Sequence, residues 1–388
     1  MTYQQIFNSN SNHLPSNEEG GYGNEVKPRR NETSEIIKTV PKYTTKAGTL
    51  RFLKDRLKSA AIADLYSFTV STWKTDREAC LSEINKLFSS SPLIVRSSCK
   101  REDNLLTSNA GAFLSKLHVD PLDIQKSVEE VIASYGDCDD SDEVLIQPML
   151  QNVVASGVAF SHDPSTSSPY RIINWAEGND TSAITGGKNG RVWYQAATAN
   201  NNHPKLSPVV TLIEELLSVF GGIPVDCEFA LTKERGKEKL WLLQARPLLL
   251  KSESLSNERQ VTLLSTIERK VTEGMQPHPF VLGQKTIYGV MPDWNPAEII
   301  GVRPKPLALS LYRDLITDSI WAYQRHNYGY RNLRSFPLMT NFFGLPYIDA
   351  RLSFNSFIPA SLNDDVAERL ANHYLQTLSK QPYLHDKI

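Results

Sequence analysis

Two short runs decide the fold of this chain: Val225–Leu231 (VDCEFAL) and, after a polar turn, Lys239–Ala245 (KLWLLQA). Side chains alternate along a strand, so the odd-numbered apolar residues of the first run share one face. Asp226 and Glu228 then share the other face. Two such runs separated by a turn containing glycine are typical of an antiparallel β-hairpin. The stretch therefore predicts a hairpin with one apolar face and one polar face.

The polar face of this hairpin has the composition of a binding site. If the turn is centred on Gly236, Glu228 lies opposite Gln244, and Asp226 lies opposite Arg246. A carboxylate beside an amide oxygen suits Mg²⁺, which prefers oxygen and completes its shell with phosphates and water. Arg246 could then contact a phosphoryl group. A solvated hairpin face with a cross-strand ion pair has the same pattern, and the residues alone leave both interpretations open.

Two stretches nearer the N-terminus could also bind phosphate. Thr45 is expected to cap a helix over residues 46–59, whose N-terminal N–H groups together with Lys46 would form an anion site. Arg96 lies near the end of a predicted strand over residues 92–98, where its planar fork could bind two phosphate oxygens. The ordinary alternatives are a solvated lysine and an arginine paired with a nearby carboxylate.

Composition excludes several classes of protein. The 388 residues contain 42 Lys and Arg against 43 Asp and Glu, a net charge of −1, which argues against a sequence-independent nucleic-acid binder. Runs of about 18 apolar residues, which a membrane span needs, are missing from the sequence. The four cysteines are scattered and the histidines lack metal-motif spacing. We therefore expect a cytoplasmic protein in a reduced compartment, without a zinc ribbon or a membrane partner.

The chain length suggests two or three domains. Residues 1–35 are polar and predict a disordered leader, and residues 36–250 predict an α+β domain. Residues 251–285 predict a helical linker, and residues 286–388, rich in aromatics and proline, predict the start of a second, smaller and mainly helical domain. No internal repeat is apparent in the sequence.

Three further local predictions can be compared with the structure. The runs 143–150 and 153–161, separated by Gln151-Asn152, are typical of a hairpin. Asn363 is expected to cap the last helix, with Val366, Leu370, Tyr374 and Leu378 as its apolar stripe. The start of a helix is indicated by Asn295, Pro296 and Glu298. This pattern does not explain Asp293 and Trp294.

Two apparent motifs fail on physical grounds. Gly186-Gly187-Lys188 suggests a phosphate-binding loop, but Ser182 and Asn189 occupy positions that the loop requires to be glycine and a hydroxyl residue. Ser161-His162-Asp163 contains the three residue types of a hydrolase triad, but neighbours in sequence cannot reach the required geometry.

Taken together, the strings resemble a known family. Five groups of residues follow in the order found in the nucleotide-binding domain of phosphoenolpyruvate synthase and pyruvate phosphate dikinase. They are Val95–Ser98 with Glu102-Asp103, Asn109–Phe113, Leu145–Met149, Ala155–Phe160 before Asp163-Pro164, and Asp226–Glu228 before Leu243–Pro247. The resemblance covers roughly residues 40–250. It implies an ATP-grasp fold, in which two α+β lobes with mixed or antiparallel sheets and flanking helices hold ATP between them, with ATP and Mg²⁺ as cofactors.

The resemblance also implies roles for individual residues. They are phosphate binding and catalysis for Arg96 and Arg246, phosphate binding for Lys46, magnesium binding for Glu228 and Gln244, and the adenine hinge for Gln147 to Met149. Lys46 stands in Thr-Lys-Ala where the family has Gly-Gly-Lys. The loop 177–190 departs from the glycine-rich pattern of the family, and no role is carried over to it.

Beyond residue 285, Met291–Ile300 and Pro304–Tyr312 resemble the branch of this family associated with bacterial surface polysaccharides, which includes the L-glutamine kinase of capsular phosphoramidate synthesis. Such an enzyme splits ATP to AMP and phosphate and passes a phosphoryl group through a histidine to the glutamine side-chain amide. The alternatives are an enzyme like phosphoenolpyruvate synthase or rifampin phosphotransferase, and a non-catalytic ATP-binding module.

The phospho-accepting histidine of this family, set in a Ser-His or Thr-Ser-His motif before small apolar residues, has no counterpart in this sequence. His162 precedes Asp163-Pro164 within the nucleotide-binding region and is therefore not that histidine. We accordingly expect the chain to be an N-terminal portion whose partner is a phosphohistidine domain in cis or in trans, with a small-molecule acceptor such as L-glutamine.

Overall fold

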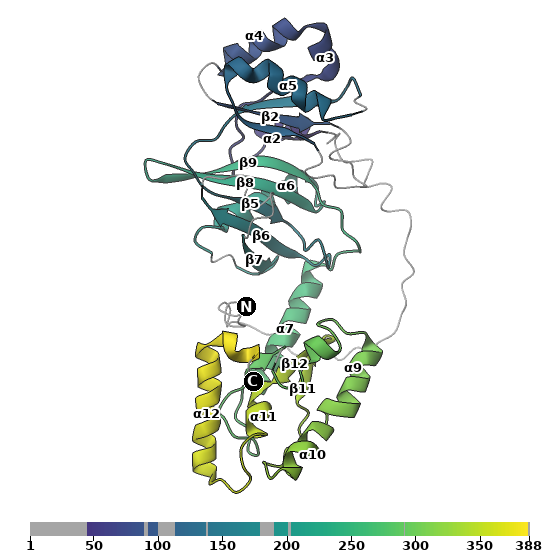
Figure 1. Ribbon diagram of the computed structural model, residues 1–388, viewed down its shortest axis with the longest axis vertical. Helices are drawn as coiled ribbons and strands as arrows, with labels where there is room; N and C mark the ends of the chain where they lie inside the picture. Colours follow the sequence, from purple (N-terminus) through teal and green to yellow (C-terminus); the bar gives the residue numbers. More distant parts are fainter. Residues whose placement is uncertain are drawn as a thin grey trace. The chain divides into compact units, whose positions relative to one another are not determined.

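The computed structural model describes residues 45–88, 92–99, 113–136, 139–178, 190–200, 203–290 and 292–386. The described chain forms two compact units, one up to Gln260 and one from Val261, here called the N-terminal unit and the C-terminal unit (Figure 1). The boundary falls within the segment 251–285 that was predicted as a linker, and the predicted leader lies outside the described residues.

The first lobe of the N-terminal unit is a four-stranded antiparallel sheet in the order β1-β4-β2-β3. One face of this sheet, with Val95 and Ile146, packs on helices through Trp73 and Ile84. Alternation places Arg96 and Gln147 on the other face. The elements of this lobe are β1 (Tyr66–Thr69), α3 (Val70–Thr75), α4 (Arg77–Phe88), β2 (Leu93–Ser98), β3 (Ser115–Val119), the 3₁₀ turn η2 (Pro121–Asp123), α5 (Ile124–Ala133) and β4 (Glu143–Pro148).

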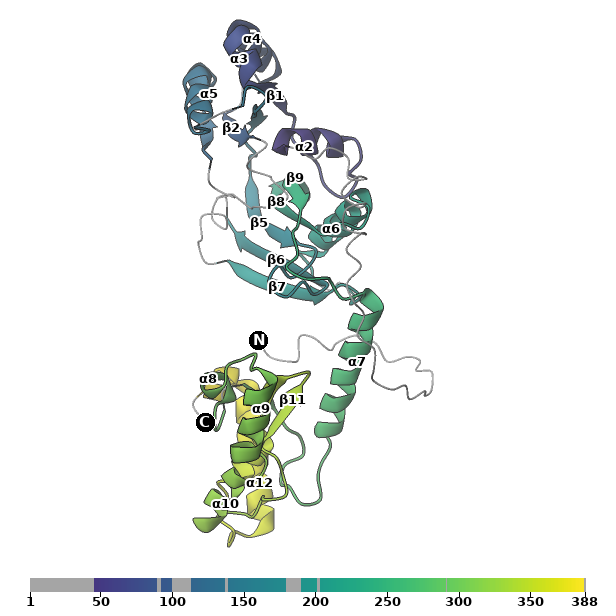
Figure 2. The same ribbon diagram turned by 90° about the vertical axis from the view of Figure 1, so that its right-hand side faces the viewer.

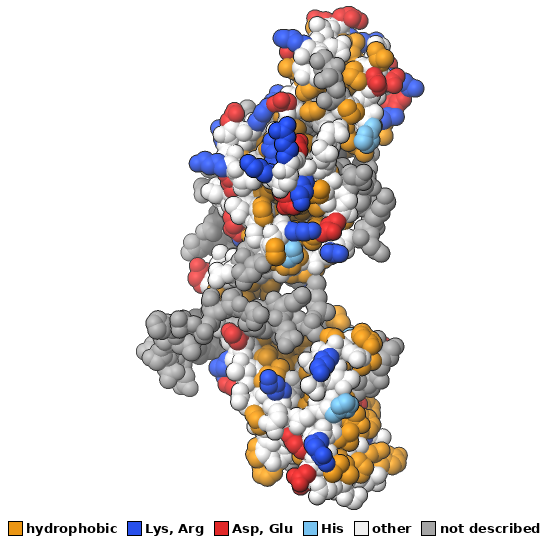
Figure 3. Space-filling view, turned by 90° about the vertical axis from the view of Figure 1, so that its left-hand side faces the viewer, with side chains coloured by type: hydrophobic (Ala, Val, Ile, Leu, Met, Phe, Trp, Pro, Cys, Tyr) orange, Lys and Arg blue, Asp and Glu red, His pale blue; other side chains and the backbone are white. Residues whose placement is uncertain are grey.

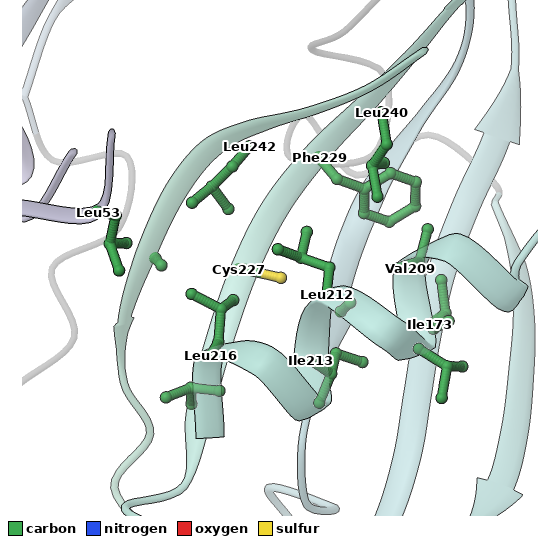
Figure 4. Close-up of a cluster of buried hydrophobic side chains, with 14 of the residues drawn as sticks. Leu53, Ile173, Val209, Leu212, Ile213, Leu216, Cys227, Phe229, Leu240 and Leu242 are labelled. Carbon is green, nitrogen blue, oxygen red and sulfur yellow. The ribbon is translucent and has the colours of Figure 1, made fainter. Parts of the chain in front are cut away.

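The second lobe is a five-stranded antiparallel sheet in the order β7-β6-β5-β8-β9. Figure 4 shows Ile173, Cys227 and Phe229 of this sheet directed toward one helix, α6. The N-terminal unit thus has the two-lobed α+β architecture with antiparallel sheets that the ATP-grasp resemblance implies. The elements are α2 (Lys46–Lys54), β5 (Val153–Phe160), β6 (Tyr170–Glu177), β7 (Arg191–Ala196), α6 (Ser207–Val219), β8 (Val225–Glu234) and β9 (Lys237–Pro247).

Helix α2 precedes the first lobe in sequence but packs into the core of the second. Leu50 and Leu53 are fully buried in the same cluster as Leu240 and Leu242, and Figure 4 shows Leu53 beside β9. The backbone of Ala61 then hydrogen-bonds along β9, from its amide to Leu240 O and from Leu242 N to its carbonyl, both at 2.9 Å. This segment covers the edge of the five-stranded sheet.

Helix α2 ends at Lys54 and not near residue 59 as predicted. The amides of Arg56 and Leu57 both donate to Leu53 O, at 2.9 and 3.0 Å. These bonds tighten the last turn and satisfy a terminal carbonyl, so the chain leaves the helix there.

The predicted hairpin between residues 143–150 and 153–161 is wrong. β4 pairs with β1 and β2 in one sheet, while β5 pairs with β6 and β8 in the other. Gln151-Asn152 therefore connects the two lobes, and Asn152 takes a positive φ of 54° at the crossing. A short polar pair between two apolar strands cannot by itself distinguish a turn within one sheet from a crossing between two.

The C-terminal unit combines a small antiparallel sheet, in the order β10-β12-β11, with several helices (Figure 2). Its core contains Trp321, Leu338 and Ile348. From the helix that enters it onward, the elements are α7 (Asn257–Gly274), β10 (Tyr288–Gly289), α8 (Pro296–Ile299), α9 (Pro306–Tyr312), the π-helical turn η3 (Arg313–Thr317), α10 (Ile320–Asn327), β11 (Met339–Phe342), β12 (Leu345–Asp349), α11 (Ala350–Asn355), α12 (Asp364–Lys380) and the 3₁₀ turn η4 (Pro382–Asp386).

The structure supplies a role for Asp293, which the helix-start pattern left unexplained. Asn295 caps α8 as predicted, its side chain accepting from Glu298 N. The carboxylate of Asp293 accepts from Arg325 Nη2 at 2.8 Å and from Ser353 Oγ at 2.9 Å, and the ion pair is largely buried. Asp293 is therefore a structural residue that ties the start of α8 to α10 and α11.

The last helix is capped as predicted but buries a different face. Asn363 accepts from the amides of Asp365 and Val366. The buried residues are Ala367, Ala371, Leu375 and Leu378, whereas Val366 and Tyr374 are 41% and 40% exposed. The buried face is lined partly by alanines, whose small side chains allow close packing. Of the predicted stripe, Leu378 is buried, whereas Val366 and Tyr374 lie beside the buried face.

The surface of the C-terminal unit carries many apolar side chains, coloured orange in the lower body of Figure 3. On α9, Leu307 and Leu311 point outward because Leu309 and Tyr312 pack inward. Among the described helices, none is both long enough and apolar enough to cross a membrane.

Candidate functional site

The hairpin of β8 and β9 has the predicted pairing at its base. Glu228 pairs with Gln244, and Asp226 pairs with Arg246. The turn differs from the prediction, because Glu234 pairs with Lys237 and only two residues lie between the strands. Those residues, Arg235 and Gly236, both have positive φ angles, 48° and 82°, as the tightest hairpin turns require. The centre of the turn therefore lies between them and not on Gly236.

A β-bulge at Leu243 reconciles this turn with the pairing at the base. Phe229 pairs with Leu242, and Glu228 pairs with Gln244, so Leu243 is the extra residue. Before the bulge the even-numbered Leu242 faces the core, and after it the odd-numbered Ala245 does. The bulge thereby turns Gln244 onto the polar face, where a regular strand would have buried it among leucines.

Arg96 joins the two lobes at this bulge. Its Nη1 donates to the carbonyl oxygen of Leu243 at 2.8 Å. Its Nη2 contacts Gln244 Oε1 at 3.2 Å and Glu228 Oε2 at 3.4 Å. The Arg96 side chain is only 11% exposed. The structure thus brings together three of the predicted site residues, from strands of both sheets.

Arg246 lies one pair further along the same face. Its Nε donates to both carboxylate oxygens of Asp226, at 2.8 and 3.0 Å. The side chains are 24% and 11% exposed, so the pair is partly buried. This cross-strand ion pair is the one that the alternative interpretation of the hairpin anticipated. Asp226 therefore fixes the position of Arg246 beside Glu228 and Gln244.

Lys46 is the first residue of α2 and is 7% exposed. The next amide, of Ala47, donates to Ser98 Oγ at 2.9 Å, which places the start of α2 against the strand that carries Arg96. The amide of Gly48 donates to Thr45 Oγ1 at 3.0 Å. Two of the N–H groups expected to be free at this helix start, those of Ala47 and Gly48, are therefore already paired.

Gln147 and Met149 lie at the end of β4, next to β2. Gln147 pairs with Ile94, and its side chain is 6% exposed, on the same face of the sheet as Arg96. The amide of Met149 donates to Pro92 O at 2.9 Å, just before the chain crosses to the second lobe. The segment predicted as a hinge is thus the last part of the first lobe before the crossing.

The donor set on the polar face suits a hard cation better than a soft one. Within the described residues, no cluster of three or more His, Cys, Asp or Glu side chains forms a complete metal site. Glu228 and Gln244 supply one carboxylate and one amide oxygen on neighbouring strands, and the Arg96 guanidinium already contacts both with positive charge. An Mg²⁺ ion completing its shell with phosphate and water would fit such a pair.

Two side chains with titratable groups lie on or next to the strands of this face. Cys227 faces the core between Asp226 and Glu228, and burial raises the pKa of its thiol. His162 contacts Ser161 Oγ through Nδ1 at 3.0 Å, and burial together with Arg171 lowers the pKa of its imidazole. Both groups are therefore neutral at pH 7.

Sequence reasoning missed two groups at this site. One is the Leu243 carbonyl, which the bulge exposes to Arg96. The Leu242-Leu243 doublet, where the apolar alternation breaks, was the available signal. The other is the Ser98 hydroxyl, which accepts from Ala47 N. A serine at a strand end gave no sign of which distant amide it would bind.

Comparisons with known proteins give a likeness of fold. No protein-family model matches the sequence, and no curated protein matches it. Among solved structures, a D-alanine-D-alanine ligase from Helicobacter pylori is 17% identical with a TM-score of 0.32, covering 53% of this chain and 54% of that one. The biotin carboxylase domain of the Hydrogenobacter thermophilus 2-oxoglutarate carboxylase, in complex with MgADP, is 9% identical with a TM-score of 0.33, covering 56% and 42%.

A third structure, PH1788 from Pyrococcus horikoshii, is 15% identical with a TM-score of 0.34, covering 58% of this chain and all of that one (100%). The chain spans about half the length of the ligases that it resembles. At this level of similarity, the function has to be argued from the residues of the chain itself.

Proposed function

We propose that the N-terminal unit binds Mg·ATP between its two lobes, as the nucleotide-binding part of an ATP-dependent phosphotransferase. The observation that carries the proposal is the contact of Arg96 with Glu228 and Gln244, which joins the first lobe to the polar face of the hairpin. Glu228 and Gln244 would hold Mg²⁺, which when bound draws charge from the phosphate oxygens.

The remaining predicted residues would hold the nucleotide. Arg96 and Arg246 would bind the phosphate chain as charge-assisted donors. Arg96 would leave the oxygens of Glu228 and Gln244 when Mg²⁺ binds them, and Arg246 would stay held by Asp226. Lys46 would add a third positive charge from the start of α2. Gln147 and Met149, at the crossing between the lobes, would lie beside the adenine. Phosphoryl transfer needs mainly positioning and charge stabilisation, which these groups can supply.

We further propose that the phosphoryl group passes through a histidine, supplied by a separate domain in cis or in trans, to the side-chain amide of L-glutamine. The support for this finer proposal is the resemblance of residues 291–312 to the glutamine kinase branch. His162 lies outside the motif of the family's phospho-accepting histidine, and its Nδ1 contacts Ser161 Oγ at 3.0 Å. Residues 1–388 alone should therefore bind ATP but make little AMP.

Calorimetric titration of Mg·ATP tests the proposal. Glu228→Gln keeps the shape of the side chain and removes the charge that Mg²⁺ needs, so it should weaken binding about 10-fold or more, the effect of one lost charged contact. Glu238→Gln is the matched control, because Glu238 lies on the same hairpin but is exposed near the turn. Equal affinities for both variants and the unchanged chain would refute the magnesium assignment.

Incubation with radiolabelled ATP and thin-layer chromatography tests the histidine route. Little AMP is expected with L-glutamine alone, and AMP formation is expected once a phosphohistidine domain is added. Steady glutamine-dependent AMP formation without that domain would contradict this part of the proposal while leaving the ATP site intact.

A further inference from the structure

Asn174 carries a side-chain oxygen that is buried and lacks a hydrogen-bond partner among the described residues. It lies on β6 between Ile173 and Trp175, which both pack into the core beneath the five-stranded sheet. Figure 4 shows Ile173 directed toward α6. By alternation Asn174 lies on the opposite face, the one that carries Glu228 and Gln244. Its unpaired oxygen is therefore on the side of the sheet where the nucleotide is proposed to bind.

The register places Asn174 in one row with the proposed magnesium ligands. Asn174 pairs with Val158 of β5, Val158 pairs with Glu228 of β8, and Glu228 pairs with Gln244 of β9. Two strand spacings of about 4.8 Å separate Asn174 from Glu228, or roughly 10 Å between their backbones. Glu228 and Gln244, on adjacent strands, are the closer pair for one Mg²⁺ ion, and Asn174 lies outside that pair. Whatever contacts Asn174 lies beside the metal, further from the first lobe.

The side chains directly beside Asn174 on this face carry no hydrogen-bond donor, and the hydroxyls of Ser156 and Tyr194 lie diagonally, one pair along the strands. The side chains directly beside it are Val158 and Val192 across the strands, with Ile172 and Ala176 along its own strand. Buried acceptors are nearly always paired in folded proteins, and leaving one unpaired destabilises the fold. The unpaired oxygen of Asn174, in line with a carboxylate and an amide, therefore needs a partner, and a bound ligand can supply it.

We propose that Asn174 binds the second substrate, by accepting a hydrogen bond from an N–H group of the imidazole or amide whose nitrogen receives the phosphoryl group. This inference rests on the proposed function, in which both the carrier ring of histidine and the glutamine amide are nitrogen nucleophiles. A nucleophile must approach the terminal phosphoryl group from the side opposite the leaving oxygen. In the proposed function the adenine lies beside Gln147 and Met149 of the first lobe, so the leaving oxygen would be on that side. The row from Gln244 through Glu228 to Asn174 leads away from the first lobe, which would put Asn174 on the side of approach.

The experiment uses the whole chain saturated with Mg²⁺ and AMP-PNP, an ATP analogue that is not cleaved between its last two phosphates. Two matched pairs of small probes are titrated by NMR: imidazole against 1-methylimidazole, and acetamide against N,N-dimethylacetamide. In each pair the second compound has lost the N–H donor. One neutral hydrogen bond should make the donor-bearing probe bind about 3- to 10-fold more tightly. A preference in the first pair identifies a ring donor, and in the second an amide donor.

The variant Asn174→Leu should bind both members of each pair equally and should bind Mg·AMP-PNP within about twofold of the unchanged chain. Its unfolding temperature without ligand should be equal or higher, because the unpaired oxygen is gone. Gln195→Leu is the matched control. It also removes an unpaired buried oxygen, but from the opposite face of the sheet, where Gln195 pairs with Arg171. Because it also removes the bond from Gln195 Nε2 to Ala199 O, 2.7 Å long, it serves as a control for the probe preference and not for stability. This control should keep the probe preference.

The outcomes separate the inference from the proposed function. Equal binding within both pairs by the unchanged chain, or binding of no probe, overturns the role of Asn174 but leaves the ATP site standing if Mg·AMP-PNP binds. A fall of several degrees in the unfolding temperature of Asn174→Leu would show that the oxygen has a partner within the protein, which also overturns the inference. Failure to bind Mg·AMP-PNP overturns both.

Discussion

The substitution Arg96→Lys tests whether the shape of the guanidinium, in addition to its charge, holds the two lobes together. Arg96 reaches Leu243 O with one nitrogen at 2.8 Å, and Gln244 Oε1 and Glu228 Oε2 with the other at 3.2 and 3.4 Å. A lysine ammonium is a single point on a flexible stem and cannot occupy both positions at once. The variant therefore keeps the charge and loses at least one charge-assisted hydrogen bond.

The structure sets the size of the effect. Hydrogen bonds to charged groups contribute about 1.5–3 kcal/mol each, and the two longer contacts place this loss near the lower end, about 2 kcal/mol. For a unit of this length, each kcal/mol shifts the unfolding temperature by roughly 2–4 °C, which gives a fall of roughly 4–8 °C. Arg96→Ala should cost more, about 3–4 kcal/mol, because it also leaves the partly buried Glu228 carboxylate without its cation.

Thermal unfolding followed by circular dichroism, without nucleotide, measures these shifts. Arg77→Lys is the control, because Arg77 makes an exposed ion pair with Glu129 at 3.3 Å and should change stability by less than about 0.5 kcal/mol. Calorimetry with Mg·ATP should then give the highest affinity for the wild type, a lower affinity for Arg96→Lys and the lowest for Arg96→Ala. An Arg96→Lys variant that melts like the wild type would refute the bridging role of the fork, and identical melting of the lysine and alanine variants would refute any role for the charge.

Three other substitutions test separate parts of the fold and the site. Gly157→Ala would place a Cβ 2.4 Å from the carbonyl oxygen of Asn174, so it should cost about 3 kcal/mol or more in a denaturant titration; a change below 1 kcal/mol would contradict the packing described. Asp226→Asn keeps the shape but weakens the hold on Arg246, so Mg·ATP affinity should fall about 3- to 10-fold in calorimetry, and an unchanged affinity would show that Arg246 needs no positioning. The pKa of His162 is lowered in the fold, so the unfolded chain takes up the proton first as pH falls below about 6.5; stability should drop from pH 7 to pH 5 in the wild type and less in His162→Asn, and parallel pH curves would refute this.

The base of the β8–β9 hairpin could be predicted because its signal is local. Alternation fixed which residues of β8 share a face, and polar residues at Gln244 and Arg246 indicated their partners. The pairing came out correct although the turn was misplaced by half a residue, because the bulge at Leu243 shifts the register by one. A bulge leaves only a weak mark in the sequence, here two adjacent leucines.

The errors arose where partners are distant in the chain. Nothing within residues 143–161 indicates that β4 pairs with β1 and β2 while β5 pairs with β8. The face buried by α12 was misjudged because alanine carries little hydrophobic signal, although Ala367 and Ala371 are fully buried. Asn174 could not be singled out for a similar reason, since the burial of its unpaired oxygen depends on the strands that flank it and not on its own neighbours in sequence.

The packing of α2 has a consequence for how this protein is made. Leu50 and Leu53 are buried against Leu240 and Leu242, so the first helix of the described chain completes its core only with the last strand of the N-terminal unit. At about 5–20 residues per second, a ribosome needs roughly 10–40 s to synthesise the chain between them. During that time the leucine face of α2 is uncovered on the nascent chain. Translation speed and access to chaperones during this interval should therefore influence the yield of folded protein more than changes made after β9 has emerged.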